Sequence, residues 1–577
     1  MRNFEKDWEK ALEYNKQFYN IEIKTELVDM TLKRHWQVQL DVNALNKLYE
    51  INIDIPIEGK NEDFPLTLPK LYISEKDRSL IKGLPNIESN GFVCTFDPAT
   101  TRTSVNNPEE IIRECLERTR EILTEGLEGK NKDNYTEEFT AYWNSGYIES
   151  KKIINCISTI NESTAEPTNI KAFHINPPQQ GFYSLMLSSD ENNINTFLDF
   201  IRIKSGFSEI ELLYVGELTF SEPPFVLTNR QSLDKIIATK PEIKNELIRY
   251  INKSSFPLII FKKTINGKSL YFGWHYKYAK KHNGFRKERL TPYNILYNLE
   301  GGKTVFGILP NLFTNERLEL RSLELPEEKT KELKIAIVGL GSLGSNLIPF
   351  LKSTRINEFR LIDSDDLRIE NLGRHFLGFE YLERNKALAM KDYLQGTNPY
   401  YKVLTREKSI VKIINDEPDV INECDYIFVC IGNSNVEEWI DIQMKKGLVN
   451  KPIFYLWVEP YLAGGHCIFV PSNSKVGFSE MFTDNYYVKN IIDKSEYDKN
   501  DLHLREAGCQ TTFVQYSYSN VVLFLSSLYP KILDIISTDV KTAEYFTWIG
   551  DVSFLKSLNL KLTGNYNSGT IMRGLLA

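Results

Sequence analysis

A short glycine-rich turn between a buried strand and a helix constrains this chain more than any other feature. Residues 334–338 (KIAIV) have the apolar pattern of a buried strand, and GLGSLGS follows directly before an apolar helical stretch. Gly339, Gly341 and Gly344 stand in the GxGxxG spacing, which permits a tight turn. Such a turn binds phosphate, because free backbone N–H groups and the positive end of the helix dipole meet there.

The next strand ends in an acid that suits the ribose of a nucleotide. Residues 358–362 (EFRLI) lead into Asp363, twenty-four residues after Gly339, where a carboxylate can accept hydrogen bonds from ribose hydroxyls. Strand, glycine loop, helix and strand in this order are typical of a doubly wound parallel sheet. We therefore expect a Rossmann-like domain over residues 326–577. To this point the motif fits ATP and NAD equally.

The residues after Asp363 favour ATP. Four further side chains that can contact a nucleotide follow it: Asp365, Asn371, Arg374 and Lys386. Together with a GxGxxGS loop that ends in Ser345, their order resembles the adenylating domains of ThiF, MoeB and the ubiquitin-activating enzymes over roughly residues 330–470. The resemblance implies that Asp363 holds the ribose and that Asn371, Arg374 and Lys386 surround the phosphates. Cations are needed there, because a carboxylate that attacks the α-phosphate is an anion approaching an anion.

The chain departs from this family at two positions. After the strand at residues 425–431 (DYIFVCI) the family commonly has an aspartate associated with magnesium, but this chain has Gly432 and Asn433. We therefore expect Mg²⁺ to depend on the ATP phosphates and on another acid, with Asp365 as the candidate. Glu383 stands where the family usually has a glycine ahead of its lysine.

Members of the family often carry a basic residue upstream that enters the site of the neighbouring subunit. Arg317 and Arg321 are the candidates for this role here, and a charge on a helix surface is the alternative interpretation of either. The same resemblance implies a homodimer through the adenylating domains.

The first region, residues 1–150, predicts an α+β domain. Alternating apolar and polar residues at 35–40 and 48–56 indicate antiparallel strands. Residues 108–125 have proline and acids in the first turn and apolar residues at three-to-four spacing, which predicts an amphipathic helix. Cys115 falls on the apolar stripe of that helix, so we expect it in the core.

This first region contains a cysteine in a distinctive setting. Residues 64–69 (FPLTLP) precede residues 84–86 (LPN), and Cys94 follows Asn86 by eight residues. The arrangement resembles the ubiquitin-conjugating fold around its catalytic cysteine, where Leu84 takes the place of the usual histidine. The resemblance implies that Cys94 is a nucleophile and that the Asn86 amide positions the loop or donates to the oxyanion. Without the resemblance, Asn86 reads as a turn residue.

A second candidate nucleophile is Cys509, in the segment 506–513 (EAGCQTTF) ahead of an apolar helical stretch. A thiol near a helix N-terminus has a lowered pKa. The segment resembles the cysteine loop of thioester-forming activating enzymes, and a partly buried structural cysteine is the alternative. The seven cysteines of the chain include no CxxC pair, which argues against a disulfide framework and a cysteine-based zinc site.

The rest of the sequence contains no further motif to which we assign a functional site. Residues 151–325 predict an α/β middle domain with strands at 257–262 and 269–275, and the basic stretch 277–289 reads as a solvated loop rather than a patch for an acidic partner. A net charge of -7 calls for neither nucleic acid nor an anionic membrane. With a charged N-terminus and no apolar run that we judge long enough to span a bilayer, we expect a cytoplasmic protein.

The order of the three regions resembles the fused enzymes of bacterial CBASS antiphage operons. The resemblance implies that ATP and Mg²⁺ are used to adenylate the C-terminus of a cGAS-like nucleotidyltransferase, which passes through thioesters on Cys509 and Cys94 to a lysine of an acceptor protein. One alternative is an enzyme for a small ubiquitin-like modifier. Another is a non-catalytic nucleotide-binding scaffold. This alternative is motivated by Gly432 and Leu84, which stand where the resembling families have an aspartate and a histidine.

Overall fold

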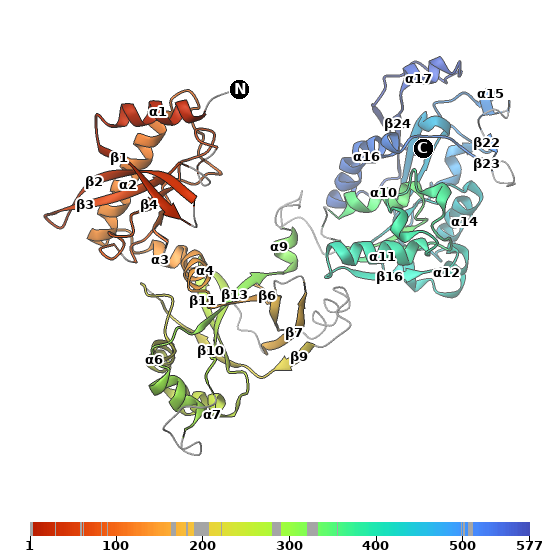
Figure 1. The fold of residues 1–577 in the computed structure, drawn as a ribbon. Helices are drawn as coiled ribbons and strands as arrows, with labels where there is room; N and C mark the ends of the chain where they lie inside the picture. Colours follow the sequence, from red (N-terminus) through yellow and green to blue (C-terminus); the bar gives the residue numbers. More distant parts are fainter. Residues whose placement is uncertain are drawn as a thin grey trace. The chain divides into compact units, whose positions relative to one another are not determined.

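The computed structural model describes residues 4–576 except 29–30, 58–60, 62, 82, 89, 163–168, 180–182, 190–206, 221, 280–289, 320–332, 353, 355, 498, 500–501, 503 and 506–511. The chain forms two compact units (Figure 1). Met1–Glu191 and Ile203–Thr314 make up the first, and the second contains Asn315–Ala577. The second unit thus begins ahead of the boundary at residue 326 that the sequence indicates.

The first unit opens with an antiparallel sheet whose strands follow one another in chain order. They are β1 (Asn20–Val28), β2 (Thr31–Ala44), β3 (Lys47–Pro56), β4 (Leu71–Ile73) and β5 (Phe92–Val93). Alternation along β2 buries Trp36, Val38 and Leu40 on one face of this sheet. The strands predicted at 35–40 and 48–56 are confirmed as parts of β2 and β3, which pair antiparallel.

Two helices, α1 (Phe4–Asn15) and α2 (Pro108–Glu128), complete this N-terminal core. Helix α2 begins at Pro108 with Glu109 and Glu110 in its first turn, so the predicted amphipathic helix is confirmed. Cys115 is fully buried on its inner face, as expected. The sheet and the two helices form the α+β domain that the sequence predicts.

Two short helices, α3 (Asn134–Glu137) and α4 (Phe139–Glu149), follow α2 but belong to the next core. Phe139 and Trp143 are fully buried among aromatic rings of the middle region. The Trp143 indole N–H donates to the carbonyl oxygen of Ile308 at 3.0 Å. By packing, these two helices therefore belong to the middle core, although they precede the boundary at residue 150 that the sequence indicates.

The middle region is built on a mixed sheet of order β10-β11-β12-β13-β6-β8-β7-β9. Its strands are β6 (Ile153–Ser158), β7 (Lys171–Gln179), β8 (Tyr183–Ser188), β9 (Phe207–Ile210), β10 (Leu213–Glu217), β11 (Leu258–Ile265), β12 (Lys268–His275) and β13 (Phe306–Leu312). The predicted strands at 257–262 and 269–275 correspond to β11 and β12, which form a hairpin. The helical segments are α6 (Asn229–Thr239), η1 (Pro241–Ile243), α7 (Lys244–Lys253), α8 (Pro292–Asn294) and η3 (Ile295–Leu299).

The second unit contains a doubly wound sheet of order β16-β15-β14-β17-β18-β19-β24-β25, which confirms the predicted Rossmann-like fold. Its strands are β14 (Leu333–Val338), β15 (Ile356–Ile362), β16 (Lys402–Arg406), β17 (Tyr426–Val429), β18 (Ile453–Val458), β19 (Gly464–Val470), β24 (Glu544–Ile549) and β25 (Ile571–Leu575). The first five in spatial order are parallel, and the last three continue the sheet antiparallel. The chain order reverses between β14 and β17, and a crevice at such a point binds ligands in this class of sheet.

Helices cover both faces of this sheet (Figure 1). One face carries α10 (Ser342–Leu351), α11 (Lys386–Thr397) and α16 (Tyr518–Thr538). The other carries α12 (Ile410–Asp416), α13 (Asp419–Asn422) and α14 (Ser434–Lys445). The smaller elements are α9 (Asn315–Glu319), η5 (Ile369–Asn371), η6 (Phe379–Tyr381), η7 (Pro460–Leu462), η8 (Ser479–Met481), β20 (Phe482–Thr483), β21 (Tyr486–Tyr487), α15 (Lys494–Tyr497), β22 (Leu504–Arg505), β23 (Thr512–Phe513) and α17 (Val552–Ser557).

Helix α16 corrects the expectation that the sequence contains no apolar run long enough to span a bilayer. Within the part of the chain that the structure describes, it is the one helix long and apolar enough to cross a membrane by length and composition. Its Val521, Phe524 and Leu528 are fully buried in the core that α10 and the sheet share. The apolar run therefore serves here as a core helix.

Candidate functional site

The glycine loop joins β14 to α10 at the switch point of the sheet. Gly339 has φ +84°, and a side chain there would lie 2.8 Å from the carbonyl oxygen of Cys430, which follows β17. A Cβ atom on Gly344 would lie 2.0 Å from the carbonyl oxygen of Gly339. No heavy atom lies within 4 Å of a Cβ built on Gly341. Two of the three glycines are thus required by close packing, and the third leaves space for a ligand.

Asp363 follows the last residue of β15 and fixes this loop. Its carboxylate accepts hydrogen bonds from the backbone N–H of Leu340 at 2.6 Å and of Asp365 at 2.8 Å. Burial raises the pKa of Asp363, and the two backbone donors oppose this rise. A carboxylate oxygen can accept more than one hydrogen bond, so Asp363 can also receive a ribose hydroxyl.

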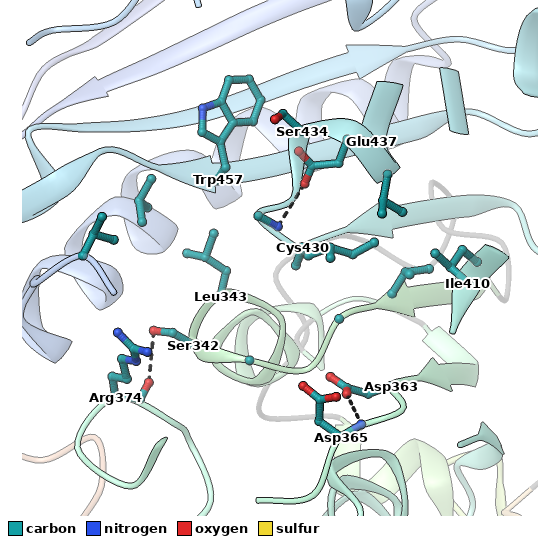
Figure 2. Close-up of a pocket in the computed structure, with 18 of the residues that line it drawn as sticks. Ser342, Leu343, Asp363, Asp365, Arg374, Ile410, Cys430, Ser434, Glu437 and Trp457 are labelled. Carbon is teal, nitrogen blue, oxygen red and sulfur yellow. Dashed lines mark hydrogen bonds between the residues drawn. The ribbon is translucent and has the colours of Figure 1, made fainter. Parts of the chain in front are cut away.

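The segment around Arg374 is anchored to the start of α10 through its backbone (Figure 2). The Arg374 carbonyl oxygen accepts hydrogen bonds from Ser342 Oγ at 3.1 Å and from Asn346 Nδ2 at 3.0 Å. The backbone N–H of Phe376 donates to Ser345 Oγ at 3.1 Å. The Arg374 guanidinium lies 5.2 Å from the ring centre of Tyr516 and lines the cavity beside the glycine loop.

His375 adds a further contact to the glycine loop. Its Nδ1 accepts from the Leu377 N–H at 3.0 Å, so Nε2 carries the proton and donates to the Leu340 carbonyl oxygen at 2.8 Å. Burial lowers the pKa of His375 to about 4, which keeps the ring neutral. His375 therefore acts as an uncharged brace for the loop.

Lys386 is the first residue of helix α11, and it lines the same cavity beside the glycine loop. Its Nζ lies 3.3 Å from Asp365 Oδ2. Asn385 caps the helix, and its Nδ2 also donates to the carbonyl oxygens of Asp363 at 3.1 Å and Asp365 at 3.2 Å. Glu383 has φ +61°, a left-handed conformation that favours glycine, which accounts for the glycine usual at this position.

A carboxylate that the sequence did not single out lies at the end of β17. Glu437, in the first turns of α14, accepts a hydrogen bond from the Gly432 N–H at 3.0 Å (Figure 2). It is only 2% exposed, and burial raises its pKa to about 7. Gly432 stands where the resemblance places the magnesium-associated aspartate, so Glu437 brings an acid back to that strand end from five residues further along.

These groups surround one cavity of about 730 Å³. Seven of the predicted nucleotide-binding residues line it: Gly339, Gly341, Asp363, Asp365, Asn371, Arg374 and Lys386. Gly344 and Ser345 lie outside the lining, because Gly344 packs on the backbone of Gly339 and Ser345 is buried behind the loop, where it holds Phe376. Aromatic side chains line the cavity as well: Trp457, Phe482, Tyr487, Tyr497 and Tyr516.

Cys94 is exposed and follows β5 in the first unit. Its backbone N–H donates to the Asn86 carbonyl oxygen at 2.9 Å, so the two residues that the sequence pairs lie opposite each other in the structure. Burial of part of the thiol raises its pKa, and the nearby acids Glu138, Glu88 and Asp97 raise it further. The five other described cysteines are buried, in keeping with core roles.

Cys509 lies outside the described residues, and so does Arg321. Strands β22 and β23 on either side of 506–511 pair antiparallel, with Leu504 opposite Phe513. The helix expected after Cys509 begins only at Tyr518, where Ser517 is the cap. Arg317 lies exposed on α9.

The sequence missed the residues that hold the site from behind. His375 and Asn385 each directly adjoin a predicted residue, which is the signal that could have found them. Glu437 had no such signal, because its partner Gly432 is reached only when α14 folds back on the loop. Among the described residues, no group of three or more His, Cys, Asp or Glu side chains could hold a metal by itself.

Comparison with known proteins identifies the two ends of the chain. Residues 316–458 match the ThiF family, and residues 18–152 match prokaryotic E2 family B. The ATP-dependent ubiquitin transferase-like protein Cap2 of Pseudomonas aeruginosa is 22% identical over 365 residues, which cover 60% of this chain and 62% of that protein.

Two further proteins match the C-terminal part. The molybdopterin-synthase adenylyltransferase of Haemophilus influenzae is 28% identical over 133 residues, which cover 22% of this chain and 53% of that protein. The crystal structure of E. coli MccB with succinimide is 16% identical and covers 46% of this chain and 67% of that chain at a TM-score of 0.30. The chain thus spans less than two thirds of the curated relatives named here.

Proposed function

We propose that this chain, which joins a ThiF-family domain to a prokaryotic E2-like domain, is an ATP-dependent protein-conjugation enzyme. It adenylates the C-terminal carboxylate of a protein, captures the acyl group as a thioester on Cys509, passes it to Cys94 and ligates it to an amine of an acceptor. The observation that carries the proposal is the cavity in which Asp363, Arg374 and Lys386 surround the glycine loop.

The cavity suits adenylation because it brings cations and N–H donors to one anionic centre. In this step a carboxylate oxygen of the substrate bonds to the α-phosphorus of ATP, the bond to the bridging oxygen breaks, and pyrophosphate leaves. In this proposal Asp363 holds the ribose, and the phosphates approach the backbone where Gly341 leaves free space. Arg374 and Lys386 offset the repulsion between the two anions.

Mg²⁺ bound to the phosphates would neutralise further negative charge. The residues present fit such an ion, because four carboxylates line the cavity: Asp363, Asp365, Glu437 and Glu459. Asp365 is 70% exposed and pairs with Lys386 at 3.3 Å, whereas Glu437 is buried at the strand end that lacks the aspartate. We assign the metal-facing role to Asp365 and Glu437 together.

The transfer steps can follow because the acyl adenylate and each thioester are activated enough to drive the next reaction. The Cys509 thiolate attacks the carbonyl carbon of the acyl adenylate and releases AMP, and the Cys94 thiolate attacks the resulting thioester and releases Cys509. Exposure of Cys94 at the end of β5 leaves its sulfur accessible to such an exchange.

The similarity to Cap2 supports a protein substrate. We propose a cGAS-like nucleotidyltransferase presented by its C-terminus, a lysine-bearing acceptor, and a cytoplasmic homodimer that forms through the ThiF domains. A small ubiquitin-like modifier is the alternative substrate, and the two are distinguished by the assay below.

The test mixes the full chain with ATP, Mg²⁺ and either a recombinant cGAS-like nucleotidyltransferase or a recombinant β-grasp modifier encoded beside it. One of them should form adducts that a reducing agent removes, and pyrophosphate should exchange into ATP. Cys94→Ala and Cys509→Ala should each change the adducts but keep the exchange, and Asp363→Ala should abolish it. Adducts and conjugates that survive both cysteine variants unchanged would refute the mechanism.

Asp363→Ala also removes two hydrogen bonds that hold the glycine loop. A second variant separates chemistry from folding. Arg374→Gln leaves the anchored carbonyl oxygen in place, so its unfolding midpoint should match the wild type while exchange falls by about 100-fold. Loss of fold in Arg374→Gln would count against the assigned role.

A further inference from the structure

The loop that leads to Cys94 is held at two points by tyrosine hydroxyls. The Tyr135 hydroxyl donates to the Gly83 carbonyl oxygen, and the Tyr142 hydroxyl accepts from the Asn86 backbone N–H at 2.6 Å. The Asn86 carbonyl oxygen in turn accepts from the Cys94 N–H at 2.9 Å. The positions of these two hydroxyls therefore help to fix the place of the Cys94 sulfur.

Further contacts of this loop also come from outside it. Leu84 packs on Gly126 of α2, where an added Cβ atom would meet it at 3.2 Å. The Asn86 side chain accepts from Asn134 Nδ2 at 2.8 Å and donates to Glu138 Oε1 at 3.3 Å. Asn86 has φ +62°, a backbone conformation that few residues adopt, so the shape of the loop depends on the elements that surround it.

One ring of the middle region, that of Phe225, braces both tyrosines. It stacks on the ring of Tyr142, with centres 5.8 Å apart and planes at 23°, and lies edge-on to the ring of Tyr135 at 6.0 Å. Phe225 is 5% exposed and belongs to the same core as Phe139 and Trp143. The core of the middle region therefore sets where the two hydroxyls lie.

The segment that precedes Phe225 also contacts the loop directly. A Cβ atom built on Gly83 would lie 3.2 Å from the side chain of Pro223, so the two residues are closely packed. The Glu222 carboxylate lies 3.7 Å from Lys132 Nζ, between α2 and α3, although an ion pair as exposed as this one contributes little. Residues 222–225 thus reach the start of the loop by contact and its middle through Tyr142.

We propose that Phe225 is a positioning residue for Cys94, and that it acts through the hydroxyls of Tyr135 and Tyr142. The inference rests on the proposed function, because the group to be positioned is the cysteine that carries the acyl group. It gives the middle region, to which no sequence motif assigns a site, a part in the transfer step.

A loosened loop should change two reactions of Cys94 in opposite directions. In the held position, partial burial and the acids Glu138, Glu88 and Asp97 raise the pKa of the thiol. A loosened loop exposes the sulfur to water and lowers this pKa, so more thiolate is present to react with an alkylating agent. Attack of an amine on a thioester requires a defined geometry, so the same loosening slows ligation.

The test compares three variants of the full chain in which Cys509→Ala leaves Cys94 as the exposed cysteine among those described. Phe225→Leu keeps an apolar side chain but removes the ring that braces both tyrosines. Tyr142→Phe keeps the stacked ring and removes the hydroxyl that accepts from the Asn86 N–H.

Phe261→Leu is the matched control. Phe261 is fully buried in the same core as Phe225, where it packs on Trp143 and Trp274. Within the described part of the chain it has no ring contact with Tyr135 or Tyr142. Its loss should therefore weaken the core without reaching the loop.

Two rates are measured at a temperature where each variant is folded, as its unfolding midpoint shows. The first is the alkylation of Cys94 by iodoacetamide as a function of pH, followed by intact mass. The second is the release of a fluorescein-labelled peptide, loaded on Cys94 from a synthetic thioester, to free lysine, with Cys94→Ala as the blank. In this release the lysine nitrogen bonds to the thioester carbon, the carbon–sulfur bond breaks with its electron pair going to Cys94 Sγ, and a proton passes from nitrogen to sulfur.

At about pH 7, Phe225→Leu should be alkylated about threefold faster than the parent, with its pH–rate profile moved to lower pH. It should release the peptide to lysine about tenfold more slowly. Tyr142→Phe should show both changes in the same directions, and Phe261→Leu should match the parent in both rates.

Parent rates in Tyr142→Phe would overturn the inference even if Phe225→Leu did not fold, because the hydroxyl is the link that the inference requires. Equal changes in Phe225→Leu and Phe261→Leu would also overturn it, since they would reflect a general loosening of the core. If the parent accepts no peptide on Cys94, the proposed function of this cysteine is wrong. The alkylation rates then still decide whether Phe225 positions the thiol.

Discussion

At the scale of single residues, Glu437 shows how burial changes the chemistry of a carboxyl group. It is 2% exposed and its pKa is about 7, against an ordinary value of 4.5. Burial is the main cause, and the N–H groups of Gly432 and Asn433 oppose it in part. The folded state therefore binds this proton more tightly than the unfolded chain.

The effect on stability has a definite sign. A pKa raised by folding contributes stability that is fully present below 4.5 and is lost as the pH rises through about 7. Without nucleotide or metal, Glu437→Gln should remove this loss. Relative to wild type, its free energy of unfolding should rise between about pH 5 and about pH 8 by up to about 3 kcal/mol. Urea titrations across this range measure the difference.

The exposed neighbour on the same helix provides the control. Glu438→Gln removes the same charge from solvent and should leave the pH dependence of wild type unchanged. If wild type and Glu437→Gln lose stability in parallel as the pH rises, the carboxyl of Glu437 is not the titrating group.

At the scale of elements, the glycine loop separates residues that the fold needs from one that a ligand needs. A Cβ atom on Gly344 would lie 2.0 Å from a backbone oxygen, so Gly344→Ala should cost about 1–3 kcal/mol of stability despite the helix propensity of alanine. Gly341 has φ -74° and free space around it, so Gly341→Ala should change stability by less than about 0.5 kcal/mol.

Nucleotide binding should rank the two variants in the opposite way. Gly341 lines the cavity, and a methyl group there occupies space that phosphates would use. In ATP titrations under conditions where the variant is fully folded, Gly341→Ala should bind ATP more weakly than wild type. Normal affinity in Gly341→Ala would show that the phosphates lie elsewhere.

Elements were predictable where one short segment determines its own structure. Helix α2, the β2–β3 pair and the β14 loop follow from local periodicity, a first-turn proline and glycine spacing. The core to which α3 and α4 belong was not predictable, because Trp143 packs with Ile308, far along the chain. The support of Asn86 by Glu138 is hidden for the same reason, since neither residue's local pattern indicates the other.

At the scale of the whole molecule, the first unit holds Cys94 together with the helices that support its loop. A fragment of residues 1–130 keeps the N-terminal core but loses Tyr142, the acceptor of the Asn86 N–H. Compared with fragment 1–314, its Asn86 amide should exchange hydrogen about tenfold faster. The Ile53 amide in β3 is the internal control, and equal protection of Asn86 in both fragments would contradict the arrangement.

The backbone anchoring of Arg374 has a consequence for the evolution of such proteins. The fold holds this residue by its carbonyl oxygen, whereas the proposed chemistry uses its guanidinium, so selection acts on the two independently. A lineage that no longer needs adenylation can change the side chain and keep the same structure. Relatives with an identical backbone can therefore be inactive, and the identity of this one side chain, rather than overall shape, is the character to compare between them.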